Sequence, residues 1–181
     1  MLKFLLHRVV RRMERRYGYD ATYLHELVDT STAGAVRYFT AQSYGRWQGP
    51  VPRDAWHAAA IGAALVEDCG PCVQIASDRA VEAGMPGATI KALLSGEPAD
   101  ADAKLGFDFA RALLTASDAL DGLRDAVEAR WGRKGIVALS TMAMYSRNFP
   151  VLKRALGHAR TCQRVRVAGS DVTVAAELKA A

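Results

Sequence analysis

Apolar residues recur at helical spacing along most of the chain, and glycine or proline separates one such segment from the next. Both residues end helices, because glycine accepts backbone conformations that stop a helix and proline lacks the N–H that continues one. We find no alternation of strands with helices, so the pattern predicts an all-α body. The predicted helices cover residues 21–44, 53–66, 69–84, 86–95, 101–116, 118–131, 134–146 and 151–159.

Residues 1–16 carry a separate amphipathic pattern. A short apolar run at residues 4–6 is followed by five arginines, whereas a signal peptide has its positive charge first and a longer apolar run after it. No segment approaches the ~20 apolar residues of a membrane span. We therefore expect a cytoplasmic protein whose first helix docks on the body of the protein or on a sister subunit rather than on an anionic membrane surface. The apolar residues at helical spacing are Leu2, Leu5, Val9 and Met13.

Strand-like sequence is confined to the region near the end of the chain. Its alternating valines, on either side of Gly169-Ser170, predict a short hairpin or an extended tail. These valines are Val165, Val167, Val172 and Val174. The length of 181 residues fits a single domain. We divide it into N-terminal helices over residues 1–50, a core over 51–160 and a tail over 161–181.

Composition changes this picture little, but the distribution of charge adds to it. Half of the residues are apolar and 24% are charged, which is typical of a globular protein and excludes extensive disorder. The net charge of +5 is the remainder of two basic ends and an acidic middle. Residues 54–128 carry thirteen acidic and five basic side chains, and residues 129–170 carry nine basic and no acidic ones. An acidic centre argues against a continuous nucleic-acid surface, and separated charge suits self-association.

Cys69-Gly70-Pro71-Cys72 is the motif with the clearest chemistry. The spacing lets the two sulfurs meet across one helical turn, and the proline fits the first turn of a helix, where its missing N–H is no loss. The free N–H groups and the dipole of a helix N-terminus stabilise a thiolate. The motif therefore indicates redox chemistry, in which one thiolate attacks a disulfide or peroxide and its neighbour resolves the product.

The same cysteines allow a second interpretation, a structural zinc site. His158 and Cys162 lie four residues apart, so they would share a face of a helix. Together with Cys69 and Cys72 they would make a Cys3His ligand set. The protein would then be a zinc-stabilised structural or interaction protein rather than an enzyme.

Two other polar groups have more than one interpretation. Glu67 and Asp68 directly precede Cys69. We expect them to occupy the favourable N-terminal end of the next helix rather than to approach the sulfur, where they would raise the pKa of the thiol. Residues 145–148, with the sequence Tyr-Ser-Arg-Asn, form a polar cluster that either lines a pocket or is solvated at a helix end.

The residues around the cysteine pair resemble those of a known family, the alkylhydroperoxidase D and carboxymuconolactone decarboxylase family. The family core is a helix, a C-x-x-C at the start of the next helix, and a small-residue stretch that ends in glycine. Residues 57–84 match it with HAAAIGAALVEDCGPCVQIASDRAVEAG, and residues 85–93, MPGATIKAL, resemble the short helix that follows. The resemblance is clear over residues 50–95 and extends to about residue 160 in helix pattern.

The resemblance implies an all-helical fold that assembles as a trimer or hexamer and needs no cofactor. In the hydroperoxidase branch it implies that Cys72 attacks the peroxide and that Cys69 resolves the product, with an external thiol as the reductant. The decarboxylase branch mostly lacks the cysteine pair. We therefore expect a peroxide or disulfide substrate and thiol chemistry.

The sequence departs from the family at two positions of its proton relay. His57 stands twelve residues before Cys69, where the family has glutamate, and Ala76 stands four residues after Cys72, where the family has histidine. Alanine cannot take a proton from the sulfur, whereas a neutral imidazole is a competent base near pH 7. Either His57 carries the proton, or it is a packed structural residue in a protein that has lost peroxidase activity and retains slow thiol–disulfide exchange.

Overall fold

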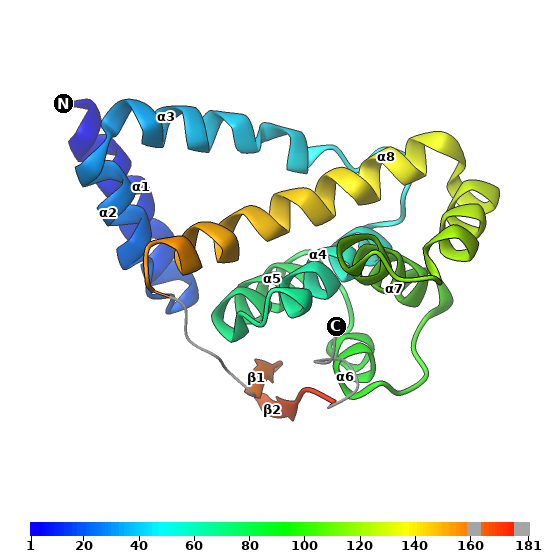
Figure 1. Ribbon diagram of the computed structural model, residues 1–181. Helices are drawn as coiled ribbons and strands as arrows, with labels where there is room; N and C mark the ends of the chain where they lie inside the picture. Colours follow the sequence, from blue (N-terminus) through cyan, green and yellow to red (C-terminus); the bar gives the residue numbers. More distant parts are fainter. Residues whose placement is uncertain (159–163, 176–181) are drawn as a thin grey trace.

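Figure 1 shows a computed structural model of the protein, which describes residues 1–158 and 164–175. The described chain is helical apart from one two-stranded hairpin, which confirms the predicted all-α fold class with a short C-terminal hairpin. None of the described helices is long and apolar enough to cross a membrane. In chain order the elements are α1 (Leu2–Tyr17), α2 (Thr22–Thr30), α3 (Thr32–Ala41), the 3-10 helix η1 (Gln42–Arg46), α4 (Arg53–Val66), α5 (Gly70–Glu82), α6 (Gly87–Ser95), α7 (Ala101–Thr115), α8 (Leu120–Ala155), β1 (Arg164–Val167) and β2 (Ser170–Thr173).

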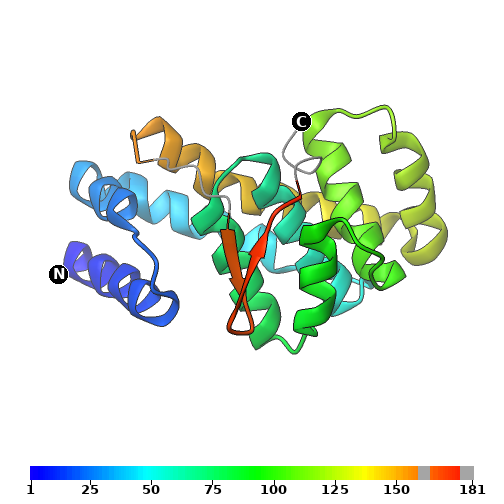
Figure 2. The same cartoon turned by 90° about the horizontal axis from the view of Figure 1, so that it is seen from below.

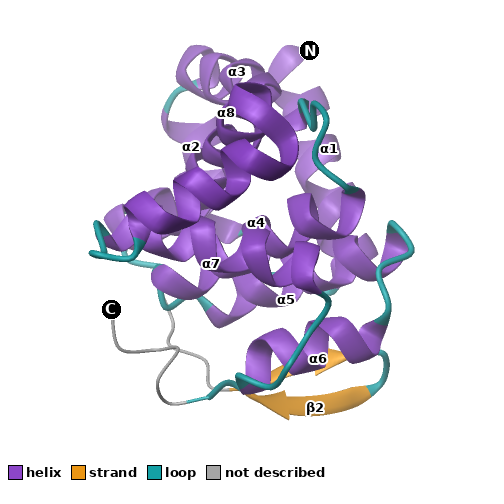
Figure 3. Ribbon diagram, turned by 90° about the vertical axis from the view of Figure 1, so that its right-hand side faces the viewer, coloured by secondary structure: helices purple, strands orange, loops and turns teal. Residues whose placement is uncertain are grey.

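Helix α4 lies in the middle of the molecule and packs against α5, α7 and α8 (Figure 3). Every residue from Ala55 to Leu65 is buried, and alanine is the commonest of them, which lets neighbouring helices approach closely. Helix α7 lies closest. A Cβ at Gly62 would lie 2.6 Å from the carbonyl oxygen of Phe107, and a Cβ at Gly106 would overlap the carbonyl group of Ala55. Glycine at both positions therefore permits the contact between α4 and α7.

The hairpin covers α5 and α6, with β1 against α5 and β2 against α6. The side chain of Gln74 on α5 continues the hydrogen bonding of β1, because it donates to the carbonyl of Arg166 and accepts from its N–H, each at 2.7 Å. The turn lies at Ala168-Gly169, one residue before the predicted position, and both residues have positive φ, as tight hairpin turns require. The four predicted valines are buried: Val165, Val167, Val172 and Val174.

The segment predicted as one helix over residues 21–44 is three elements, so that prediction was wrong. Helix α2 ends before Ser31, which adopts an extended conformation (φ −153°, ψ 97°), and α3 begins after it. The hydroxyl of Ser31 accepts a hydrogen bond from the N–H of Gly34 at 3.0 Å. A serine in this position satisfies a free N–H of the new helix and so favours a second start. The two helices leave Ser31 in clearly different directions (Figure 1).

The breaks predicted within residues 118–159 are only partly present. Helix α8 is interrupted at Gly132 (φ 67°, ψ −176°), near the first predicted break. The second break is absent, because α8 continues through Pro150 although proline cannot donate a backbone hydrogen bond. Pro150 and Lys153 are both buried, and this packing keeps the last turns helical despite the missing bond. Of the predicted segment 151–159, the last residue lies outside the described residues.

Within the protein, α1 docks through a face other than the predicted one, and docking of the predicted face on a sister subunit stays a prediction. Val10 is buried against α2, and Met13 is partly buried, whereas Leu2, Leu5 and Val9 are exposed. The side of the helix that is centred on Val10 also carries the polar groups that bond to α2, and these bonds fix the rotation of the helix.

Helices α1 and α2 lie together at one end of the molecule (Figure 2). Two sets of polar contacts tie them to the rest of the protein. Arg16 and Tyr17 on α1 bond to the carboxylate of Glu82 on α5 at 2.8–3.0 Å. Glu26 on α2 lies 2.6 Å from Nε2 of His158, beyond the end of α8. The first set holds the end of α1 at the C-terminal end of α5, and the second holds α2 near the end of α8.

Candidate redox site

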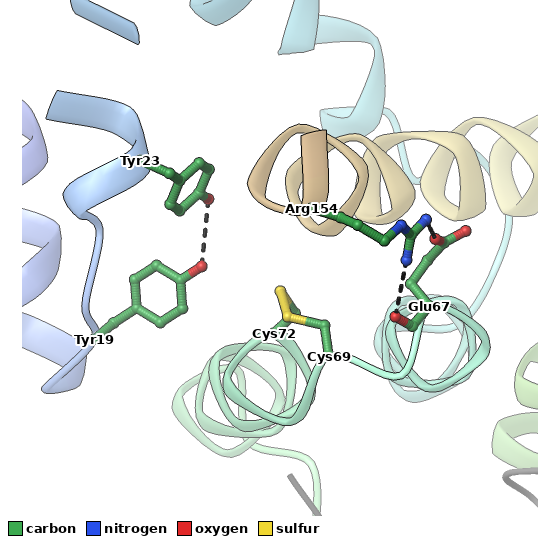
Figure 4. Close-up of a disulfide and its surroundings, with 6 residues drawn as sticks. All are labelled: Tyr19, Tyr23, Glu67, Cys69, Cys72 and Arg154. Carbon is green, nitrogen blue, oxygen red and sulfur yellow. Dashed lines mark hydrogen bonds and ion pairs between the residues drawn. A yellow bond between two sulfur atoms is a disulfide. The ribbon is translucent and has the colours of Figure 1, made fainter. Parts of the chain in front are cut away.

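The two cysteines of the motif are bonded to each other at the start of α5 (Figure 4). Their Cα atoms are 5.2 Å apart. Cys69 is the N-cap residue (φ −109°, ψ 86°), and its carbonyl accepts hydrogen bonds from the N–H groups of Cys72 and Val73, both at 2.9 Å. Pro71 lies in the first turn. This is the local arrangement that the motif predicts, with both sulfurs at a helix N-terminus.

The two cysteines are buried in different surroundings. Cys69 lies under the hairpin, in a small hollow with Val165 and Val174. Cys72 forms part of the wall of a cavity of about 300 Å³. A molecule in this cavity therefore meets the disulfide from the Cys72 side.

Five helices contribute to the cavity beside Cys72. Its walls are mainly aromatic and apolar, and none of the lining residues is Asp or Glu. Two members of the polar cluster predicted at residues 145–148 belong to the wall, which is one of the two roles that the sequence allowed. The lining residues are Met13, Tyr17, Tyr19, Tyr23, Trp56, His57, Ala60, Cys72, Ile75, Ala76, Arg79, Met142, Tyr145, Ser146 and Phe149.

The structure brings His57 into the same cavity wall as Cys72 and Ala76. His57 is only 9% exposed. Its pKa is lowered to about 4, first because burial disfavours the charged imidazole and second because the positive charges of Arg79 and Arg53 oppose protonation. His57 is therefore neutral at pH 7 and able to accept a proton. Among the described residues that line the cavity, it is the one histidine or carboxylate.

The lowered pKa of His57 predicts a pH dependence of stability. In the unfolded chain the imidazole titrates near pH 6.5, so between pH 6.5 and pH 4 the unfolded state binds a proton that the folded state does not. The stability that depends on a neutral His57 is fully present above about pH 6.5. It is lost as the pH falls towards 4, and the free energy of unfolding should then fall by about 2–3 kcal/mol. Urea unfolding of the wild type and of His57→Gln at several pH values measures it. Carboxylates titrate in both proteins, so the difference between the two reports on His57. If the free energy of unfolding depends on pH equally in the two proteins, His57 is not buried and neutral.

Glu67 carries a buried charge beside the disulfide (Figure 4). Its side chain is 3% exposed, and its carboxylate lies 2.5 Å from Nε of Arg147 and 2.6 Å from Nη2 of Arg154, both on α8. Arg154 also donates to the backbone carbonyl of Glu67 at 3.4 Å. Glu67 thus ends α4 and binds α8. The first turn of α5 contains no acidic residue, so the prediction that Glu67 and Asp68 occupy the N-terminal end of this helix was wrong. The two guanidinium groups offset the negative charge of Glu67, which would otherwise oppose a thiolate at Cys69.

A tyrosine pair lies on the other side of the disulfide from Glu67 (Figure 4). The hydroxyl of Tyr19 donates to that of Tyr23 at 3.3 Å, and burial raises the pKa of both side chains, so both stay protonated. Lys153 is 4% exposed, and its Nζ lies 4.8 Å from the ring centre of Tyr19 and 5.7 Å from that of Tyr23. The rings stabilise this buried ammonium group by cation–π attraction.

Sequence reasoning missed Glu67 as an ion-pair partner, and it missed Arg147, Lys153 and Arg154. The sequence contained one signal of these ion pairs. Residues 129–170 have no acidic residue, so any basic side chain of this stretch that becomes buried needs a partner from another part of the chain. The identity of those partners depends on how α8 crosses the end of α4, which no local pattern contains.

The described residues do not assemble the predicted zinc set. The sulfurs of Cys69 and Cys72 are bonded to each other, so neither is a free thiolate ligand, and Nε2 of His158 lies 2.6 Å from Glu26. Cys162 lies outside the described residues. Within residues 1–158 and 164–175, no group of three or more His, Cys, Asp or Glu could hold a metal ion.

A scan against models of protein families, a search of curated proteins and a search of solved structures all found no match. The resemblance of residues 50–95 to the alkylhydroperoxidase D family therefore remains a prediction from the sequence. Support for a function comes from the site itself: the cysteine pair, the cavity and the neutral imidazole.

Proposed function

We propose that the protein is a thiol–disulfide or peroxide-linked oxidoreductase that acts through Cys69 and Cys72. The observation that carries the proposal is the position of Cys72, which is bonded to Cys69 at a helix N-terminus and also lines a cavity of about 300 Å³. The cavity gives a substrate access to the sulfur. The neutral His57 in the same wall gives the thiol proton an acceptor.

The first step takes place at Cys72 in the reduced protein. The dipole at the start of α5 stabilises its thiolate, and His57 accepts the thiol proton. The thiolate attacks the terminal oxygen of a hydroperoxide, and the O–O bond breaks. Cys72 becomes a sulfenic acid, and the other oxygen takes the proton from His57 and leaves as an alcohol.

Cys69 completes the oxidation. Its sulfur attacks the sulfenic sulfur of Cys72, the S–O bond breaks, and the hydroxyl leaves with the Cys69 proton as water. The product is the disulfide shown in Figure 4. An external dithiol then reduces it to two thiols and is itself oxidised to a disulfide. When the substrate is a disulfide, the thiolate of Cys72 attacks one of its sulfurs, its S–S bond breaks and one half leaves as a thiol. Cys69 then attacks the mixed disulfide at the sulfur of Cys72 and releases the other half as a second thiol.

Rapid-mixing kinetics test the proposal. The reduced full-length protein is mixed with cumene hydroperoxide, and the reaction is followed by tryptophan fluorescence, because Trp56 lines the same cavity as Cys72. Because the helix N-terminus stabilises the thiolate of Cys72 and a neutral imidazole lines the same cavity, we expect a rate constant about 100-fold or more above that of free cysteine. A Cys69→Ser/Cys72→Ser protein, which keeps Cys162, is the control. A rate constant equal to that of free cysteine, with both the hydroperoxide and oxidised glutathione, would rule the proposal out.

A further inference from the structure

The cavity beside Cys72 contains a positive charge that forms no ion pair with a carboxylate of the described residues. Arg79 lies on α5 two turns after Cys72 and lines the cavity. Its Nη1 donates to the hydroxyl of Tyr145 at 3.4 Å, and no carboxylate in the described part of the chain forms an ion pair with it. Glu82, on the same helix, is near enough for its charge to attract Arg79, but its carboxylate is already bound by two residues of α1. The guanidinium group of Arg79 is therefore available to an anion in the cavity.

A second donor in the wall has no acceptor in the part of the chain that the structure describes. Trp56 is 8% exposed, and its Nε1 is buried without a hydrogen-bond partner among the described residues. A buried N–H without an acceptor is unfavourable and is rare in folded proteins, so it calls for a partner. Trp56 lines the cavity, so an acceptor on a bound molecule that reaches Nε1 would satisfy its N–H.

The rest of the wall suits an apolar molecule. Ile75, Met142 and Phe149 contribute apolar side chains, and four tyrosines also line the cavity. Since none of the lining residues is Asp or Glu, a bound anion meets no like charge. A volume of about 300 Å³ lies at the lower end of the range for small-molecule sites.

We propose that this cavity binds an organic carboxylate with an apolar body, with the carboxylate against Arg79 and Trp56 and the body against the aromatic wall. The inference rests on the proposed function in one respect, since this molecule is then the hydroperoxide or disulfide that Cys72 reduces. An arginine binds a carboxylate through two N–H groups, and the bond is stronger where little water competes. Hydrogen peroxide has neither a carboxylate nor an apolar part, so it uses none of these groups.

Isothermal titration calorimetry tests the inference on the oxidised full-length protein. The probes are phenylbutyrate and its uncharged amide, which share the same apolar body. We expect the carboxylate to bind about tenfold or more tightly than the amide, because a charge-assisted hydrogen bond is stronger than a neutral one. Arg79→Met should abolish this preference, and Arg79→Lys should keep part of it. Arg37→Met is the matched control, because Arg37 is exposed on α3 and does not line the cavity.

The wild-type comparison alone can overturn the inference, whatever the variants do. Equal binding of the two probes, or no binding of either, contradicts it, and so does a carboxylate preference that survives in a folded Arg79→Met protein. The titration is repeated on Cys69→Ser/Cys72→Ser, which has no redox chemistry at the site. Selective binding together with unreactive thiols would overturn the proposed function alone. Reactive thiols together with unselective binding would overturn the carboxylate site alone.

Discussion

Cys72→Ser is expected to slow the reaction of the reduced protein with hydroperoxides by about 100-fold or more, to the background rate. Cys69→Ser is expected to leave the first oxidation intact. The two variants should differ because the two cysteines lie in different surroundings. Cys72 lines the cavity with His57, whereas Cys69 lies under the valines of the hairpin. In Cys69→Ser the reaction then stops at a sulfenic acid, because no neighbouring thiol resolves it.

Two measurements separate the roles of the cysteines. Rapid-mixing kinetics give the rate of the first step, and mass spectrometry after treatment with dimedone counts trapped sulfenic acid, which we expect at one per chain in Cys69→Ser. Both single variants carry Cys162→Ser, so that the third thiol contributes to neither signal. Loss of the first step in Cys69→Ser, with full reactivity in Cys72→Ser, would show that the cavity does not select the nucleophile.

The second large effect is expected from the contact between α4 and α7. In Gly106→Ala the new Cβ would lie 2.8 Å from the carbonyl carbon of Ala55 and 3.1 Å from its Cα, and it would overlap the carbonyl oxygen. These are backbone atoms in the middle of the core, so the two helices must move apart. We expect the free energy of unfolding to fall by about 3 kcal/mol, measured by urea unfolding with circular dichroism.

Gly122→Ala is the matched control, because Gly122 also lies in a helix and nothing lies within 4 Å of the position of its Cβ. Alanine costs less backbone entropy than glycine in a helix, so this variant should gain up to about 1 kcal/mol. Similar changes in the two variants would show that helix propensity, and not the close approach of α4 and α7, decides the outcome at Gly106.

Local signals predicted much of the helical layout. Asp100 accepts hydrogen bonds from the N–H groups of Asp102 and Ala103 at the start of α7, as an N-cap aspartate should, and Gly96 ends α6 with positive φ. The cysteine motif lies at the start of a helix for the same reason, because Pro71 fits a first turn. In each of these cases a residue and its near neighbours determine the conformation.

The errors arose where distant packing decides. Pro150 stays helical because its turn is buried against other elements, and α1 docks through Val10 because its polar partners are on α2. The candidate site follows the same rule. Both cysteines could be found from four consecutive residues, but the cavity is built from five helices, and Glu67 meets Arg154 across 87 positions of sequence. Contacts of this kind depend on how helices cross, which the pattern of a single helix does not contain.

The placement of Arg79 has a consequence for proton affinity. Its positive charge is one cause of the low pKa of His57, and it is also the charge that is open to an anion. An anion bound at Arg79 would cancel part of that charge and return proton affinity to the imidazole. By thermodynamic linkage, a proton on His57 would then tighten anion binding by the same factor. The imidazole would thus be a weak base in the empty cavity and a stronger one in the filled cavity, so that proton uptake from the thiol is favoured when a substrate is present.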